Sequence, residues 1–342
     1  MIEVGTLNID VILDARASAD EIASLGRLAE RYGLRTVWVS SLLDARDPFT
    51  NFSVLARSST SIRMGPIAVN PYEMHPVRIA TALLTLNELS QGRAAIVVGG
   101  GGEALEALSI EPVRRVRAVR ECVEIIRRAA AGDVVDYQGE LYRVRGYHLW
   151  WVEAAAPLLY VAANRPQMLR MAARVADGIM LSDLPPPLVT EAVKLVDDAL
   201  AALGRARRDF RINNFVAWHV YEDRRRAVRE ARQWLWLRGL FRRWVLETFL
   251  DESDCDLVLS RRAAFQKAFL DKTPVIEGVP ERILEALVEA LTLTGSVSEL
   301  DRMIERLKQF QSAGLTEIAL RIYANPADAI RLIGERIVPA VA

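Results

Sequence analysis

The order of elements along the chain predicts a (β/α)8 barrel, also called a TIM barrel, with a helical insertion late in the chain. Eight short apolar runs alternate with segments whose apolar residues recur at helical spacing. Short, continuously apolar runs are typical of strands buried in a parallel sheet, and eight strand–helix units suit a closed barrel. A doubly wound sheet is the alternative, but it needs fewer strands and a phosphate fingerprint after the first strand. We therefore expect one domain over residues 1–342.

The first part of the chain supplies four of these units. The predicted strands cover residues 2–9, 35–40, 62–69 and 94–98, and the predicted helices cover residues 20–32, 52–61, 76–89 and 114–131. Gly33 ends the first helix, and Pro76 occupies the first turn of the third. These two residues mark a helix end and a helix start at places where a barrel requires the chain to turn.

The second part supplies four more strands and contains two irregular segments. The predicted strands cover residues 158–162, 178–181, 210–220 and 316–321, with helices at 166–176, 189–203 and 326–337. Residues 133–152 alternate aromatic and polar side chains around Gly139, which predicts a hairpin-like excursion. Residues 222–295 form a helical insertion rich in aromatic residues and arginines. Packing on the barrel or a subunit interface is favoured over a lid on a substrate, because aromatic stripes usually belong to a core.

Composition excludes several classes of protein. Lys+Arg and Asp+Glu both number 44, which gives no net charge to attract nucleic acid or a membrane. Cys122 and Cys255 are too few for a disulfide framework, and the three histidines, at 75, 148 and 219, lack metal-ligand spacing. We expect no metal site. Neither a signal peptide nor a long apolar run is found, so a cytoplasmic protein is expected.

Residues 62–103 indicate where a ligand binds. They predict a strand, a helix, a second strand and a glycine-rich turn, and a flat ligand could lie across both strand ends. Gly99–Gly102 expose bare backbone, and Glu103 follows them. From the residues alone, Glu103 is a helix N-terminal carboxylate rather than an acid of raised pKa. His75, before Pro76, is a helix cap rather than a base.

A second candidate is the turn at residues 162–166. Asn164 can cap the following helix, Pro166 fits its first turn and Arg165 adds a positive charge, so a phosphate would bind well at this helix start. An ordinary capped helix explains the same residues.

Several segments match a known family. They are GPIAVNPYEMHP at residues 65–76, LSQGRA at 89–94, PLLYVAANRPQMLRMAARVADGIML at 157–181 and SAGLTEIALRIY at 312–323. Together they resemble the bacterial-luciferase-like barrel oxidoreductases, in particular the branch that uses the deazaflavin coenzyme F420, and within it the methylenetetrahydromethanopterin reductases. The resemblance extends over nearly the whole chain and is weakest at residues 222–295.

The resemblance implies one cofactor at the carboxyl end of the barrel, with F420 favoured and FMN as the alternative. It also implies a non-prolyl cis peptide bond between Ile67 and Ala68 that supports the ring. The implied cofactor contacts are Pro66, Ile67, Ala68, Asn70, Gly99, Gly100, Gly101, Ala162, Ala163, Asn164, Arg165, Leu181 and Ser182. The run GGGGEALEA resembles the turn of F420-dependent sugar-phosphate dehydrogenases whose glutamate transfers a proton, which makes Glu103 the implied catalytic residue.

The chain departs from the family on the substrate side. Many relatives have W-x-(S/T)-D-H after the second strand, whereas this chain has Ser41 and Leu42 at the last two positions. Histidine acid–base chemistry is therefore impossible at Leu42. Ser41, Asp44, Arg46 and Asp47 become the candidate substrate contacts.

Three hypotheses follow. The first is an F420-dependent oxidoreductase that transfers hydride between the deazaflavin and a small substrate, with a C1 unit on tetrahydromethanopterin or tetrahydrofolate as the best single candidate. The second is an FMN-dependent two-component monooxygenase, and the third is a barrel homologue without catalysis. The family implies a homodimer or homotetramer that binds a small molecule.

Overall fold

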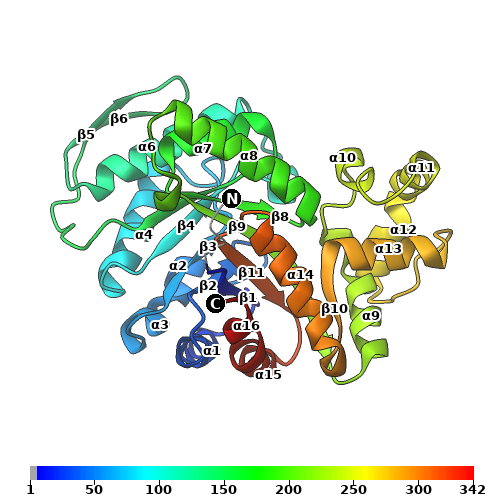
Figure 1. The fold of residues 1–342 in the computed structure, drawn as a ribbon. Helices are drawn as coiled ribbons and strands as arrows, with labels where there is room; N and C mark the ends of the chain where they lie inside the picture. Colours follow the sequence, from blue (N-terminus) through cyan, green and yellow to red (C-terminus); the bar gives the residue numbers. More distant parts are fainter. Residues whose placement is uncertain (1–5) are drawn as a thin grey trace.

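Eight parallel strands form the barrel in the computed structural model, which describes residues 6–342 and, for Glu103, the backbone alone (Figure 1). The strands are β1 (Asn8–Leu13), β2 (Thr36–Ser40), β3 (Arg63–Ile67), β4 (Ala95–Val98), β7 (Leu158–Ala162), β8 (Gly178–Ser182), β9 (Arg211–Tyr221) and β11 (Glu317–Ile322). Their order is β3-β2-β1-β11-β9-β8-β7-β4, and two isolated bridges, Met64–Ala94 and Val69–Val98, join the end strands. The predicted barrel is confirmed, and the doubly wound sheet is excluded.

Helices surround the barrel between successive strands (Figure 1). They are α1 (Ala19–Arg31), α2 (Pro48–Asn51), α3 (Ser53–Ser58), α4 (Pro76–Leu89), α5 (Glu103–Ala107), α6 (Arg115–Ala130), α7 (Pro166–Val175), α8 (Pro186–Ala202), α14 (Leu300–Ser312), α15 (Pro326–Leu332) and α16 (Val338–Val341). Helix α1 begins at a capping box, in which Ser18 and Glu21 each bond the other's backbone N–H. The prediction contains no counterpart of α14. Within residues 6–342, none of the helices has the length and apolar character needed to cross a membrane.

Two apolar clusters hold the fold together. The larger one lies between strands and helices, and the smaller one fills the barrel with side chains such as Ile12, Trp38, Tyr160 and Met180. Alternate residues of a strand face the same side, so Ala162 and Ser182 continue the inward rows of Tyr160 and Met180. Because these last inward residues are small, the carboxyl end of the barrel has room for a ligand.

Strands β3 and β4 approach unusually closely where the barrel closes. A Cβ atom placed on Gly65 would lie 1.8 Å from the carbonyl oxygen of Ala95. No side chain fits in that space, so the glycine allows the two strands to meet.

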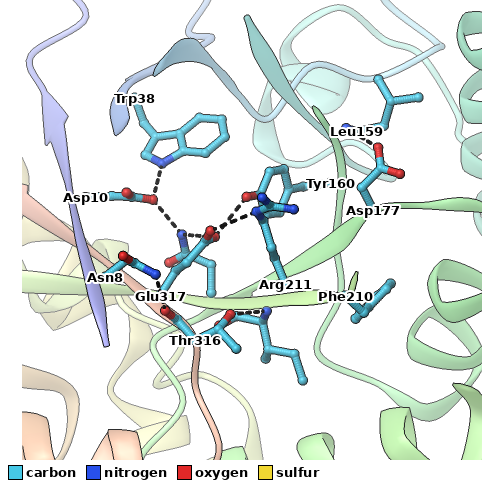
Figure 2. Close-up of polar contacts among 12 residues, drawn as sticks. Asn8, Asp10, Trp38, Leu159, Tyr160, Asp177, Phe210, Arg211, Thr316 and Glu317 are labelled. Carbon is cyan, nitrogen blue, oxygen red and sulfur yellow. Dashed lines mark hydrogen bonds and ion pairs between the residues drawn. The ribbon is translucent and has the colours of Figure 1, made fainter. Parts of the chain in front are cut away.

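A buried polar network fills the amino end of the barrel (Figure 2). Asp10 Oδ2 accepts hydrogen bonds from Trp38 Nε1 at 2.9 Å and Asn213 Nδ2 at 2.8 Å. Glu317 accepts one from the Tyr160 hydroxyl at 2.9 Å and lies 3.3 Å from Arg211 Nε. Burial and then the charge of Glu317 raise the pKa of Asp10 well above its usual value, and burial raises that of Glu317. These carboxyls lie at the end of the barrel that normally serves stability rather than catalysis.

Asp10→Asn is expected to flatten the dependence of stability on pH. The pKa of Asp10 is higher in the folded chain than in the unfolded chain. Its contribution to the free energy of unfolding is therefore full below the unfolded pKa of about 4 and is lost as the pH rises toward the folded pKa. Each unit of difference between these pKa values is worth about 1.4 kcal/mol. Urea unfolding from about pH 4 to about pH 8 measures how the free energy of unfolding changes with pH in the wild type and in Asp10→Asn.

The control for this experiment is Asp209→Asn, which makes the same change at a carboxylate that is 72% exposed. We expect its slope to match that of the wild type. If the free energy of unfolding changed with pH equally in the wild type and in Asp10→Asn, the raised pKa of Asp10 in the folded chain would be contradicted.

The two irregular segments lie on different sides of the barrel (Figure 1). Within residues 133–152, β5 (Val135–Gln138) and β6 (Arg143–Tyr147) pair as an antiparallel hairpin. Within residues 222–295 lie α9 (Arg224–Gln233), α10 (Arg243–Leu246), α11 (Glu252–Ser260), α12 (Arg262–Leu270) and α13 (Glu281–Leu291). The predicted end of the insertion is wrong, because its last residues begin β10 (Thr292–Ser296), which pairs with β9 in parallel.

Two further expectations are corrected. The first strand is β1, Asn8–Leu13, rather than residues 2–9, of which residues 2–5 lie outside the described part. The implied cis bond between Ile67 and Ala68 is wrong, because residues 6–342 contain no cis peptide bond. In the trans chain, Ile67 O accepts a hydrogen bond from Ser41 N at 2.7 Å, and the N–H of the next peptide bond, Val69 N, donates to Val97 O at 3.0 Å.

Candidate active site

A cavity of about 630 Å³ opens at the carboxyl ends of the barrel strands, within the usual size of small-molecule sites. Segments that follow β2, β3, β4, β7 and β8 form one part of its wall, and the insertion forms the rest. The lining residues are Ser41, Leu42, Ala68, Asn70, Glu73, Gly99, Gly100, Gly101, Gly102, Ala104, Ala162, Ser182, Asp183, Trp236, Leu237, Arg238, Gly239, Phe241, Arg242 and Arg262.

Eight of the residues predicted from the sequence meet in this cavity. They are Ser41, Ala68, Asn70, Gly99, Gly100, Gly101, Ala162 and Ser182. They come from five consecutive positions around the barrel, β2, β3, β4, β7 and β8. The structure therefore brings these residues together on one side of the cavity, and the role of each stays a prediction.

The glycine turn after β4 presents bare backbone to the cavity. A Cβ atom on Gly99 would lie 3.1 Å from the Cβ of Ala68 and 3.6 Å from that of Ala162. Gly101 has φ +80°, and a Cβ there would lie 2.1 Å from Leu105 Cδ1. Side chains at these positions would strain the turn or fill the cavity, so the glycines make a surface that a flat ring can approach.

Asn70 fixes the loop after β3. Its Oδ1 accepts hydrogen bonds from the backbone N–H groups of Tyr72 at 3.1 Å and Glu73 at 3.0 Å. Its Nδ2 donates to the Glu73 carboxylate. This Asx turn holds the loop without help from a ligand.

Asn164 joins the ends of β7 and β8 instead of capping α7. Ser182 N donates to Asn164 Oδ1 at 3.0 Å, and Asn164 Nδ2 donates to Ser182 O at 3.2 Å. The capping residue of α7 is Arg165, which makes no capping bond and whose guanidinium carbon lies 4.8 Å from the ring centre of Trp244. The expected cap is therefore wrong, while a phosphate site at this helix start stays a prediction.

Other predicted residues lie outside the lining. The cofactor contacts Pro66, Ile67, Ala163 and Leu181 are buried in or beside their strands. The proposed substrate contacts have partners elsewhere: Asp44 pairs with Arg16 at 2.6 Å, Arg46 donates to the carbonyl of Arg16, and Asp47 caps α2. These local bonds hold the loop after β2, so Ser41 is the one predicted substrate contact that reaches the cavity.

Sequence reasoning considered the insertion as a lid over the substrate but named none of the residues that form this wall of the cavity as part of the site. Arg238 Nη1 donates to Asp183 Oδ1 at 2.9 Å, and its Nη2 donates to the Tyr323 hydroxyl at 2.8 Å. Both side chains of the Arg238–Asp183 ion pair are only 3% exposed. Burial raises the pKa of Asp183, and the charge of Arg238 opposes this shift. The favoured view of the insertion as packing alone is incomplete, because the segment WLWLRGLFRRW, residues 234–244, also lines the cavity.

The three histidines lie outside the cavity lining and make other contacts. His75 caps α4 by accepting from Val77 N at 3.3 Å, as predicted, and His148 contacts the carbonyl of Gly132 at 3.1 Å. His219 lies 2.7 Å from Glu230 and stacks on Tyr323, with ring centres 4.7 Å apart. Burial lowers the pKa of His219 and favours its neutral form. The cavity lining contains no histidine, and residues 6–342 show no cluster of side chains suited to a metal ion among those described.

Glu103 is the first residue of α5, and its side chain lies outside the described part. Its neighbours in the chain, Gly102 and Ala104, both line the cavity. The backbone of Glu103 therefore runs along the cavity wall, and its catalytic role stays a prediction.

A parallel eight-stranded barrel with a glycine-walled cavity at its carboxyl end has the active-site layout of (β/α)8 enzymes. The family model described as luciferase-like monooxygenase matches residues 6–317, and the chain belongs to this family.

Individual relatives cover almost the whole chain. A 5,10-methylenetetrahydromethanopterin reductase of Archaeoglobus fulgidus is 27% identical over 325 residues, which are 92% of this chain and 93% of that protein. The solved structure of the coenzyme F420-dependent tetrahydromethanopterin reductase of Methanopyrus kandleri has a TM-score of 0.80 at 20% identity, over 99% of this chain and 100% of that one. An F420-dependent secondary alcohol dehydrogenase, solved with an F420–acetone adduct, has a TM-score of 0.76 at 15% identity and the same coverage.

Proposed function

We propose that the chain is an F420-dependent oxidoreductase of the luciferase-like family. The observation that carries this proposal is the cavity at the carboxyl end of the barrel, walled by Gly99–Gly102 and floored by Ala162 and Ser182. Its bare backbone and its size suit a flat tricyclic ring. Relatives over the full length of the chain are named for F420 or for methylenetetrahydromethanopterin reduction, which supports the same cofactor and chemistry here.

The roles of individual residues follow from their positions. The Gly99–Gly102 turn and Ala68 would contact the ring, and the Asn164–Ser182 pair would hold the strand ends beneath it. When bound, the deazaflavin supplies a carbon that accepts or donates hydride. Glu103 would hold or deliver the accompanying proton. Neither described carboxylate of the lining is free for that task, because Asp183 pairs with Arg238 and Glu73 bonds Asn70.

The substrate that we propose is a C1 unit carried by tetrahydromethanopterin or tetrahydrofolate, reduced from the methylene to the methyl level in one-carbon metabolism. The names of the relatives support this choice. We also propose a cytoplasmic homodimer or homotetramer, on the strength of the family resemblance. The FMN-dependent monooxygenase remains the alternative because the family name includes that activity.

Titration with oxidised F420, with reduced F420 and with FMN tests the proposal, and calorimetry should detect saturable binding of F420 in preference to FMN. Glu103→Gln is expected to keep this binding while lowering the rate with reduced F420 and methylene-tetrahydropterin by about 10²–10⁴-fold, because it removes the proton-transferring group.

Glu106→Gln is the matched control, since it makes the same change on an exposed face of the same short helix. It should leave both binding and rate unchanged. No binding of F420 in either redox state would overturn the proposed function, and preference for FMN would favour the alternative.

A further inference from the structure

The insertion turns a cationic and aromatic surface toward the cavity, formed by Trp236, Phe241, Arg242 and Arg262, which we call the insertion face. The guanidinium carbon of Arg262 lies 5.2 Å from the ring centre of Trp236 and 5.4 Å from that of Phe241. The two rings are 5.2 Å apart. Arg262 therefore makes cation–π contacts with both rings.

The arginines of this face lack the partners that neighbouring arginines have. Arg238 is paired with Asp183, and Arg243, next in sequence to Arg242, is paired with Asp256. In the part of the chain that the structure describes, the guanidinium groups of Arg242 and Arg262 make no ion pair or hydrogen bond, and both residues are exposed. The charge of Arg242 opposes the rise in the pKa of Asp183, a carboxylate that is already paired with Arg238. Two guanidinium groups beside a cavity are thus available to an anion.

The described acidic groups of the lining do not cancel these charges. Asp183 is committed to Arg238, and Glu73 accepts a hydrogen bond from Asn70. With Arg238 offsetting Asp183, two positive charges face one negative charge along the described lining. A bound molecule that brings a negative group to the insertion face therefore gains charge-assisted hydrogen bonds.

We propose that Arg242 and Arg262 bind a carboxylate or phosphate group of the substrate, and that Trp236 contacts a flat ring attached to that group. This inference rests on the proposed function, because it assigns the glycine turn to the cofactor and the insertion face to the substrate. A guanidinium group without a hydrogen-bond partner has its N–H donors free, and their fork matches the paired oxygens of a carboxylate or phosphate. The substrate class is thus an aromatic or heteroaromatic organic anion.

An anionic group at this face could also belong to the phosphate-bearing tail of the cofactor, and the experiment separates the two sources. Calorimetry on the F420-loaded protein would use benzoate, phenyl phosphate and the uncharged benzyl alcohol as probes. A second series would compare F420 with the deazaflavin alcohol that lacks the phosphate tail. The variants are Arg242→Gln, Arg262→Gln and Arg262→Lys, with Arg208→Gln as control, because Arg208 is 87% exposed and lies outside the cavity lining.

We expect both anions to bind the loaded protein at least about tenfold more tightly than benzyl alcohol. Each Gln variant should weaken anion binding by about tenfold and leave the affinity for F420 unchanged. Arg262→Lys should restore only part of the affinity, because it keeps the charge and loses the planar fork, and Arg208→Gln should change nothing.

Three results would overturn the inference. The first is equal binding of neutral and anionic probes, or no binding of either anion at about 10 mM. The second is an unchanged anion affinity in both Gln variants. The third is a loss of F420 affinity with no loss for the tail-free deazaflavin, which would assign the arginines to the cofactor. Failure of the proposed function would give a different result, because the wild-type protein would then bind no F420. The anion titration on F420-free protein would still test the insertion face in that case.

Discussion

Gly65→Ala is expected to destabilise the protein by at least about 3 kcal/mol, enough to prevent soluble expression if the starting stability is ordinary. The added methyl group would lie 1.8 Å from the carbonyl oxygen of Ala95 and 2.6 Å from its carbon. Both are backbone atoms, which cannot rotate away as a side chain can. Strands β3 and β4 would have to separate at the point where isolated bridges alone close the barrel.

Urea unfolding measures this loss, with Gly295→Ala as the matched control. Gly295 also lies in a strand, but its nearest contact to an added Cβ would be 3.4 Å, an ordinary packing distance. We expect the control to change stability by about 1 kcal/mol or less. A Gly65→Ala protein as stable as this control would show that the spacing of β3 and β4 is adjustable.

Arg238→Met is expected to lower the free energy of unfolding by about 3–5 kcal/mol, because it leaves the buried carboxylate of Asp183 without its partner. The arginine also donates to Tyr323, which follows β11, so it ties the insertion to two strand ends of the barrel. The same variant should weaken F420 binding, since Asp183 and Arg238 both line the cavity. Urea unfolding and calorimetric titration measure the two effects.

The double variant Asp183→Asn/Arg238→Met should recover much of the lost stability, because the orphaned charge is removed with its partner. Asn suits position 183, where φ is +55°. Arg243→Met serves as the control, because its partly exposed ion pairs with Asp256 and Glu247 are worth about 1 kcal/mol or less. A double variant that is less stable than Arg238→Met would show that Asp183 is not the source of the loss.

Hydrophobic periodicity predicts most of the barrel because each strand is a short apolar run between helices of regular pattern. It fails at β1, where polar Asp10 resembles the end of a strand. In the fold Asp10 lies inside the barrel, where its Oδ2 accepts hydrogen bonds from Trp38 and Asn213, residues distant in sequence. It also fails at β10, whose sequence TLTGS has little apolar content and is recognisable as a strand only by its pairing with β9.

Site residues at the strand ends can be predicted from the sequence, whereas those in the loops and in the insertion cannot. Residues at or directly after the carboxyl ends of strands, such as Ala68, Gly99 and Ser182, are predictable because all parallel strands of a barrel end at the same rim. Asp44 and Arg46 lie farther along the loop after β2, where both bond to Arg16 and stay outside the cavity lining. Arg238 and Arg262 come from the insertion, and no periodic pattern indicates which of its arginines reach the cavity.

The bare backbone of the Gly99–Gly102 turn has a consequence for how this enzyme can be re-engineered. Side chains at Gly99 and Gly101 would crowd Ala68 and Leu105, so at these two positions the shape of the cavity wall cannot be changed without straining the turn. The wall formed by Trp236, Arg242 and Arg262 consists of side chains on a segment outside the barrel strands. Libraries that seek new substrates should therefore diversify Trp236, Phe241, Arg242 and Arg262, and should keep Arg238, Gly99 and Gly101.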